Sequence, residues 1–118
     1  WLEDYALVEP QVVDNPDTRV LQVAWTTARA DKCQFFYDLP ALKSAYLASE
    51  QSAGASPESL ARLDKSFEFT RGSVAGRIAT NDGYCSKQSN VNDIRTDLNR
   101  YLAGDFSTRA VKKLTTVE

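Results

Sequence analysis

Apolar side chains recur three or four positions apart through most of this chain, and residues that start or stop helices interrupt them at intervals. This spacing places the apolar side chains on one side of an α-helix, which completes a turn every 3.6 residues. No stretch alternates apolar and polar residues between two hairpin turns, as paired β-strands do. The pattern therefore predicts an all-α fold.

Three helix starts are marked by a capping side chain close to a proline: Asn15-Pro16, Asp38 before Leu39-Pro40, and Ser56-Pro57. A helix accepts proline in its first turn, where the missing N–H has no partner to lose. Short connections between helices favour antiparallel neighbours. The predicted architecture is an irregular antiparallel bundle of four to five helices with one disulfide. Helices are expected over residues 17–31, 39–51, from Ser56-Pro57 to a stop at Asn81-Asp82-Gly83, from about Val91 to Gly104, and from Phe106 to about Leu114.

A chain of 118 residues has room for one hydrophobic core, so we expect a single helical domain over residues 17–118. Residues 1–16 lack a long helical period and are expected to form an N-terminal arm. The apolar side chains of this arm are too many for a free tail, so we expect it to lie along the domain or against a neighbouring chain. These side chains are Trp1, Leu2, Tyr5, Leu7 and Val8.

The two cysteines, Cys33 and Cys85, are 52 positions apart. This separation matches neither a C-x-x-C redox motif nor a metal site with four ligands. We expect a structural disulfide, which in the chain-entropy model stabilises the fold by roughly 4 kcal/mol for a loop of this length. The alternative is a pair of buried thiols in a reducing compartment.

The chain starts at Trp1 and contains no methionine. We therefore expect that an upstream segment was removed, and a cleaved secretory signal accounts for this, although an artificial truncation would look the same. The longest apolar runs, such as Val20 to Trp25, are far shorter than the ~20 residues that cross a bilayer. The sequence predicts a periplasmic or secreted protein without a membrane span.

Histidine is absent, which excludes Ser-His-Asp and Cys-His mechanisms and removes the commonest ligand of zinc and copper. With 14 basic and 16 acidic side chains, the net charge of −2 leaves no basic surplus for nucleic acid. The oxygen-bearing residues Asn90, Asn92, Asp93 and Asp97 match no calcium-binding loop, and we expect them to stabilise a helix start. No metal, no cofactor and no nucleic-acid partner is predicted.

The helix expected to start at Ser56-Pro57 has a second apolar side, roughly 140–200° from Phe67, that carries Phe69, Gly72 and Gly76. In one interpretation this helix is central and another helix packs over the glycines, because glycine inside a helix costs about 1 kcal/mol and usually has a packing reason. In the other, Phe69, Gly72, Ser73 and Gly76 form a shallow exposed groove for a partner helix, including that of a second copy. We take these four residues as the predicted binding site.

Most aromatic side chains are expected in the core, because a domain of this size needs their bulk there. The alternative is that some of them line a ligand pocket between helices. The residues concerned are Trp25, Phe35, Phe36, Tyr37, Phe67, Phe69 and Tyr84.

The layout of Cys33 and Cys85 in a small, all-helical, exported chain resembles that of the bacterial periplasmic acid-stress chaperones. The resemblance implies a mechanism in which acid neutralises carboxylates, opens the contacts of a dimer and exposes apolar surface for client proteins.

Two functions follow as hypotheses. The first is a small exported non-catalytic interaction protein, of the binding, inhibitor or chaperone-like kind, that acts through a helical surface or the N-terminal arm on a protein partner, a homodimer included. The alternative is a small-molecule-binding or lyase-like enzyme, in which Tyr84 or Tyr101 faces a carboxylate in a pocket between helices. The first is preferred, and no enzyme is predicted, because no set of residues meets the geometric demands of a catalytic site.

Overall fold

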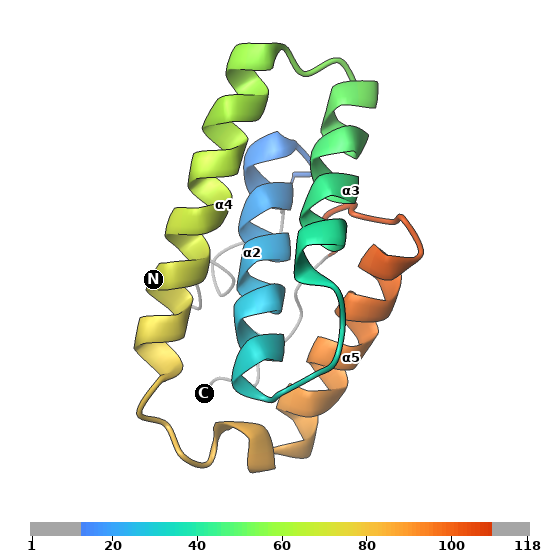
Figure 1. Cartoon of the computed structure of the whole chain (residues 1–118). Helices are drawn as coiled ribbons and strands as arrows, with labels where there is room; N and C mark the ends of the chain where they lie inside the picture. The colour runs from blue at the N-terminus through green and yellow to red at the C-terminus, as the bar shows by residue number, and fades with distance from the viewer. Residues whose placement is uncertain (1–12, 110–118) are drawn as a thin grey trace.

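A computed structural model describes residues 13–109, which contain four α-helices and one short 3-10 helix (Figure 1). The α-helices are α2 (Pro16–Lys32), α3 (Leu39–Ser52), α4 (Pro57–Ile78) and α5 (Gln88–Leu102), and η1 (Tyr84–Ser86) lies between α4 and α5. No strand occurs in this part of the chain, so the all-α prediction is confirmed. None of the helices described is long and apolar enough to cross a bilayer.

The helix starts agree with the capping residues in the sequence. The side chain of Asn15 accepts the backbone N–H of Thr18 at 2.9 Å, and the hydroxyl of Thr18 accepts the N–H of Asn15 at 3.1 Å. Asp38 and Ser56 each accept an N–H from the first turn of α3 and α4. These contacts join residues close in sequence, which is why the sequence predicts them. α5 has no side-chain cap and begins at Gln88, before the expected Val91.

α2 is the central helix of the bundle. It runs in the same direction as α4 and packs along it, whereas α3 and α5 run in the opposite direction (Figure 1). α2 also contacts α5, and α3 packs on α4. Consecutive helices are therefore antiparallel, as predicted. α4 lies at one edge, so the interpretation that made it central is wrong. The small alanine and threonine side chains of α2 allow this helix to be buried on several sides instead.

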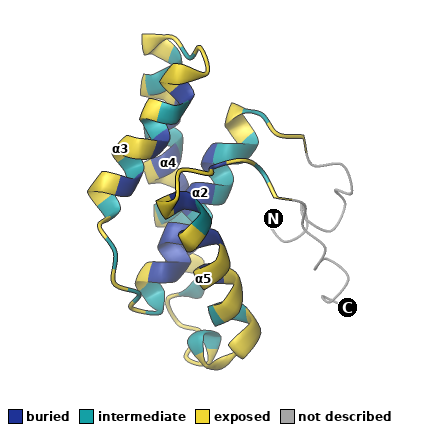
Figure 2. Ribbon diagram, turned by 90° about the vertical axis from the view of Figure 1, so that its right-hand side faces the viewer, coloured by how far each residue is buried: buried dark blue, intermediate teal, exposed yellow. Residues whose placement is uncertain are grey.

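A chain of four aromatic rings runs through the core. Phe67 of α4 stacks on Tyr46 of α3, with ring centroids 6.4 Å apart. Phe106, beyond the end of α5, meets Tyr46 edge-on at 5.6 Å and stacks on Tyr101 of α5 at 5.7 Å. Buried residues gather on the inward sides of the helices and exposed residues on the outer sides, which is clearest for α5 in Figure 2. The aliphatic part of this core consists of Val20, Val23, Leu42, Leu63, Ile94 and Leu98.

The segment after α5 contradicts the predicted helix from Phe106 to Leu114, because residues 105–109 are not helical. The guanidinium of Arg109 donates two hydrogen bonds of 2.7 Å to Asp97 of α5. The side-chain amide of Gln22 pairs with the backbone N–H and C=O of Arg109. These contacts with distant residues, together with the burial of Phe106, override the local helical pattern. We call residues 105–109 the C-terminal strap.

Parts of the predicted chain ends lie outside the described residues. These are residues 110–118 of the predicted last helix and residues 1–12 of the predicted arm. Pro16, assigned to the arm, belongs to α2.

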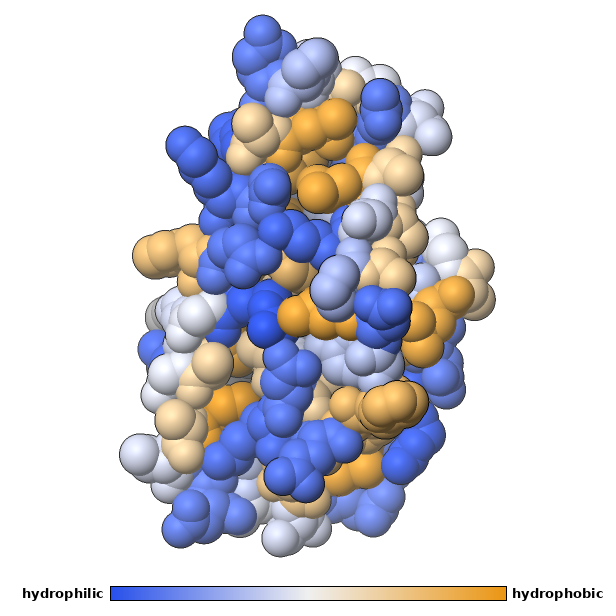
Figure 3. All heavy atoms as spheres, in the orientation of Figure 1, coloured by the Kyte–Doolittle hydropathy of each residue, from blue (hydrophilic) through white to orange (hydrophobic). Residues whose placement is uncertain are grey.

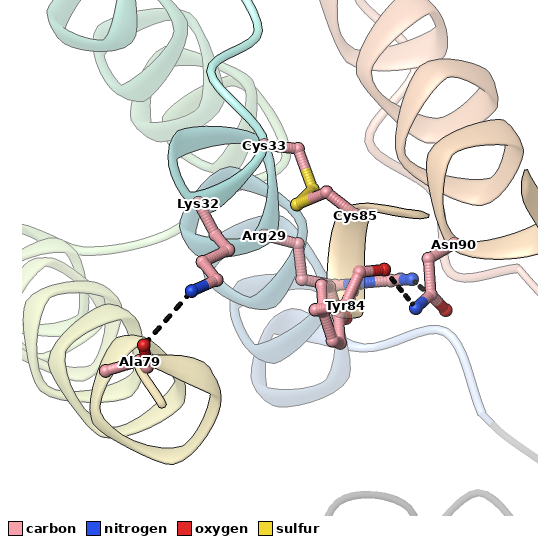
Figure 4. The surroundings of a disulfide bond; sticks show 7 residues. All are labelled: Arg29, Lys32, Cys33, Ala79, Tyr84, Cys85 and Asn90. Atoms are coloured by element: carbon pink, nitrogen blue, oxygen red, sulfur yellow. Dashed lines mark hydrogen bonds between the residues drawn. A yellow bond between two sulfur atoms is a disulfide. The ribbon is translucent and has the colours of Figure 1, made fainter. Parts of the chain in front are cut away.

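Cys33 and Cys85 form the predicted disulfide, with their Cα atoms 5.5 Å apart. The bridge joins the C-terminal end of α2 to η1 (Figure 4). Close to it, the ammonium of Lys32 donates to the carbonyl of Ala79, which follows α4. The connection between α4 and α5 is thereby held against the end of α2.

Polar contacts around Tyr84 reinforce this connection. The guanidinium of Arg29 donates to the Tyr84 hydroxyl and lies over the tyrosine ring, 5.6 Å from its centroid. The amide of Asn90 donates to the carbonyl of Tyr84 at 2.8 Å (Figure 4). Arg29 is only 9% exposed, so its charge is stabilised inside the fold by the aromatic ring and these polar groups.

Candidate interaction surface

α4 uses two of its sides inside the bundle. Towards α3, the ammonium of Lys43 lies 2.5 Å from carboxylate oxygens of both Asp64 and Glu68. Burial disfavours the charge of Lys43, but the hydrogen bonds to the two carboxylates outweigh it and raise the pKa of the lysine. The side of α4 that is buried in the core carries Leu63, Phe67, Thr70 and Val74.

The remaining side of α4 is exposed except at Ser73, which is partly buried. We call Lys65, Phe69, Gly72, Ser73 and Gly76 the outward face of α4. Phe69 is 78% exposed. A Cβ atom built on Gly72 or Gly76 would meet nothing within 4 Å in the described part of the molecule, and neither glycine has a positive φ. Within residues 13–109, therefore, neither the backbone conformation nor a packed neighbour requires glycine at these positions.

The structure brings the four predicted site residues together on this one face. It places no described helix over Gly72 and Gly76. The interpretation in which another helix packs over the two glycines therefore finds no such helix within residues 13–109. The reason is the position of α4 at the edge of the bundle. Binding at the outward face of α4 stays a prediction.

Phe36 is fully exposed, where the sequence indicated a core position. It lies in the connection from α2 to α3. Gln34 has a φ of 60°, which ends α2 and lets the N–H of Phe35 donate to the carbonyl of Ala30 at 2.9 Å. Phe35 then packs against the core and Phe36 is left in solvent. The sequence does contain a signal for this exposure. Phe35, Phe36 and Tyr37 are consecutive, and three consecutive side chains cannot all point towards the core.

A shallow groove of about 370 Å³ lies between α3 and α4, lined by Leu47, Ala48, Leu60 and Ala61. Figure 3 shows apolar atoms gathered near the upper end of the face that these two helices present. Leu47 also packs against the core. The groove is therefore the outer edge of the contact between α3 and α4.

Two tyrosines lie beside carboxylates, the arrangement that an enzyme of the predicted kind needs. Tyr46 is near Glu50, which accepts hydrogen bonds of 2.7 and 2.9 Å from Arg19. Tyr101 is near Asp97, which an arginine of the C-terminal strap holds. Burial raises the pKa of both phenols, that of Tyr101 to about 12. Both phenols are therefore protonated near neutral pH, and both carboxylates are already paired.

A hollow of about 200 Å³ lies beside Arg19 and Glu50. Ligand pockets usually measure roughly 300–1,000 Å³. The arginines that line the hollow are balanced by carboxylates, because Arg19 also contacts Asp14 at 3.0 Å and Arg62 contacts Asp17 at 3.2 Å. The hollow is small and has no excess of charge that would select a ligand.

The expectation that the oxygen-bearing residues cap the start of α5 is wrong, because this helix has no side-chain cap, and three of the four make other structural contacts. Asn90 donates to a backbone carbonyl, Asn92 accepts from Gln88 at 2.9 Å, and Asp97 accepts from Arg109. Within residues 13–109, no three side chains of the histidine, cysteine, aspartate and glutamate types are grouped so that they could hold a metal ion.

Comparisons of this chain with protein-family models, with curated proteins and with solved structures give no match. The resemblance to the periplasmic acid-stress chaperones therefore rests on the cysteine layout and the helical fold alone. The functional inference rests on the surface geometry.

Proposed function

We propose that this protein is a small exported interaction protein, without a catalytic role, that binds a helix of a protein partner through the outward face of α4. One observation carries the proposal. An exposed phenylalanine, Phe69, precedes two glycines on the same helix face, and no atom of the described residues would crowd a side chain at either glycine.

Both kinds of residue favour contact with a helix. Burying an exposed phenylalanine side chain contributes about 1.5–3 kcal/mol, and aromatic residues near the centre of an interface often dominate its binding energy. Gly72 and Gly76 let a second helix approach closely, because no side chain separates the two backbones. Each glycine destabilises α4 by about 1 kcal/mol relative to alanine. Close approach of a partner accounts for this loss.

The charges on α4 restrict the chemistry of the partner. Lys65 is exposed one turn before Phe69, and Arg62, a further turn towards the N-terminus, contacts the exposed Asp17. A complementary helix has a small residue opposite Phe69, side chains that fit over Gly72 and Gly76, and an acidic group towards Lys65.

Catalysis has less support than binding. The carboxylates of the two tyrosine–carboxylate clusters already bind arginines inside the fold, and the hollow beside Glu50 is smaller than a usual ligand pocket. An enzyme with a tyrosine and a carboxylate in a pocket between helices remains the alternative hypothesis.

We also propose a periplasmic or secreted location. Disulfides persist in oxidising compartments, and the bridge between Cys33 and Cys85 is compatible with one. In the source cell, both cysteines should resist alkylation until a reductant is added, which mass spectrometry detects. Two alkylated thiols in protein that was never reduced would contradict the proposal.

The binding proposal is tested by capture with immobilised protein followed by titration with each purified captured protein. Phe69→Lys should abolish the binding of at least one captured protein, because it places a charge at the centre of the contact. Leu102→Lys is the matched control, since Leu102 is a 56% exposed apolar residue on α5. Both variants should melt close to the parent temperature. Equal affinity of every captured protein for the parent chain and Phe69→Lys would refute the proposal.

A further inference from the structure

We infer that the helix that binds the outward face of α4 is α4 of a second copy of this chain, so that two antiparallel helices form the contact of a weak homodimer. This inference rests on the proposed function and names its partner. It follows from the order of residues along the outward face of α4, which makes the face complementary to itself.

On this face the large side chain of Phe69 and the open space above Gly76 lie at equal distances from the midpoint between Gly72 and Ser73. If a twofold axis passes between Gly72 and Ser73, an antiparallel α4 places Phe69 of one copy opposite Gly76 of the other. Gly72 then lies opposite Ser73. In each copy Phe69 is about 10 Å along the helix from Gly76, at 1.5 Å per residue. The two contacts between Phe69 and Gly76 therefore form at the same time. Each aromatic ring enters the space above a glycine where no described atom lies within 4 Å of a built Cβ.

Parallel pairing lacks this complementarity. In parallel helices equivalent residues face each other, so Phe69 meets Phe69 and the space above both Gly76 residues stays open. The charges also distinguish the two orientations. Parallel pairing brings Lys65 beside Lys65, whereas antiparallel pairing separates the two lysines by about 20 Å, which exceeds the screening length of about 8 Å at physiological salt.

Antiparallel pairing also gives Lys65 a favourable neighbourhood. Each lysine then lies near the C-terminal end of the other copy's α4, which is the negative end of the helix dipole. The exposed Asp82 follows that end of the helix. Because the exposed Arg77 also lies in the last turn of α4, this end carries both signs of charge, and the inference rests mainly on the match between Phe69 and Gly76.

The size of the contact sets its strength. The strip from Lys65 to Gly76 is about 18 Å long at 1.5 Å per residue, so the buried area stays below the ~1,200 Å² of a stable interface. We therefore expect a reversible dimer with a dissociation constant roughly between micromolar and millimolar.

Sedimentation equilibrium of the purified, oxidised protein tests the dimer, from about 10 μM to about 1 mM. The parent chain should show a mass that rises with concentration. Phe69→Ala should weaken the dimer at least about 30-fold, and Gly76→Leu should weaken it comparably by filling the space that receives the ring. Phe36→Ala is the matched control, because it removes a fully exposed phenylalanine outside α4 and should leave the dimer unchanged.

Cysteine cross-linking tests the orientation. Antiparallel pairing places Ser73 of one copy beside Ser73 of the other, so Ser73→Cys should form a linked dimer under mild oxidation. Lys65→Cys should not, because its sulfur atoms would be about 20 Å apart. A parent chain that stays monomeric at 1 mM, Phe69→Ala that dimerises as the parent does, or cross-linking at Lys65→Cys as fast as at Ser73→Cys would overturn the inference. These measurements need no other protein, so their failure is separate from that of the capture experiment, which decides the proposed function.

Discussion

Replacing Phe106 by alanine should be among the most destabilising single changes in residues 13–109. Its ring is 4% exposed and lies between Tyr46 and Tyr101, with centroid distances of 5.6 and 5.7 Å. Truncating a buried phenylalanine to alanine costs about 3–5 kcal/mol, through lost burial and the cavity that remains. A domain of this size has a total stability of only about 5–15 kcal/mol, so the loss is large.

A second contribution comes from the C-terminal strap. Phe106 and Arg109 hold the strap in place together, and Arg109 neutralises Asp97, which is 5% exposed. If the strap detaches in Phe106→Ala, Asp97 loses this partner and keeps Arg100, at 3.5 Å. Because Arg100 still pairs with Asp97, the further cost is smaller than the ~1–3 kcal/mol of a buried polar group that is left unsatisfied. The expected total therefore lies towards the upper end of the range for Phe106 alone.

Urea unfolding followed by far-ultraviolet circular dichroism measures this loss, with the slope of the transition checked against that of the parent protein. Leu102→Ala is the control, because this side chain is 56% exposed one turn earlier, and it should cost less than about 1 kcal/mol. In a double-mutant cycle, Phe106→Ala and Arg109→Ala should together cost less than the sum of the single changes, because either one releases the strap. A loss below about 1.5 kcal/mol for Phe106→Ala, or strict additivity, would refute this account of the strap.

Four further measurements follow from the structure. Reducing the bridge between Cys33 and Cys85 should lower the free energy of unfolding by roughly 4 kcal/mol, measured by urea unfolding with and without reductant, and an unchanged midpoint would contradict a structural role. Gln34→Gly should raise the stability by about 0.5–1 kcal/mol, because glycine adopts the φ of 60° without strain, whereas Gln51→Gly in α3 should lower it. Gly76→Ala should raise the melting temperature, because alanine favours the helix by about 1 kcal/mol and its Cβ has space, and a lower melting temperature would reveal packing over this glycine. Hydrogen bonds from the hydroxyl and the N–H of Ser107 hold the pKa of Asp105 below its ordinary value, so the stability from this carboxylate is present above about pH 4 and is lost as the pH falls through the lower folded value. Asp105→Asn should therefore flatten the acid side of the stability profile, and identical profiles would contradict the assignment.

The sequence predicts those parts of the fold that depend on neighbouring residues. The starts of α2, α3 and α4 are encoded by Asn15, Asp38 and Ser56, whose side chains bind N–H groups three residues ahead. The disulfide is also predicted, because two cysteines at this separation have few other uses. These features need no knowledge of which helices meet.

The errors occur where contacts between distant residues decide the structure. The apolar spacing from Phe106 onwards is helical, yet Phe106 fits between two rings of the core and Arg109 binds Asp97, and these contacts require a non-helical backbone. Phe35 and Phe36 are the same residue type in adjacent positions, and the φ of Gln34 determines which of the two packs against the core. A helical wheel carries neither kind of information.

The two apolar sides of α4 show how the fold decides between a packing role and a binding role. If a helix is central, its second apolar side packs against another helix, and close packing then explains the glycines on that side. α2 occupies the central position instead, and its threonines and alanines are buried on several sides. With α4 at the edge, the same Phe69, Gly72 and Gly76 lie in solvent, and no described atom would contact a side chain at either glycine. The identity of the central helix thus determines whether this face is core or contact surface, and a stability gain in Gly76→Ala together with a weaker dimer would confirm both halves of that argument.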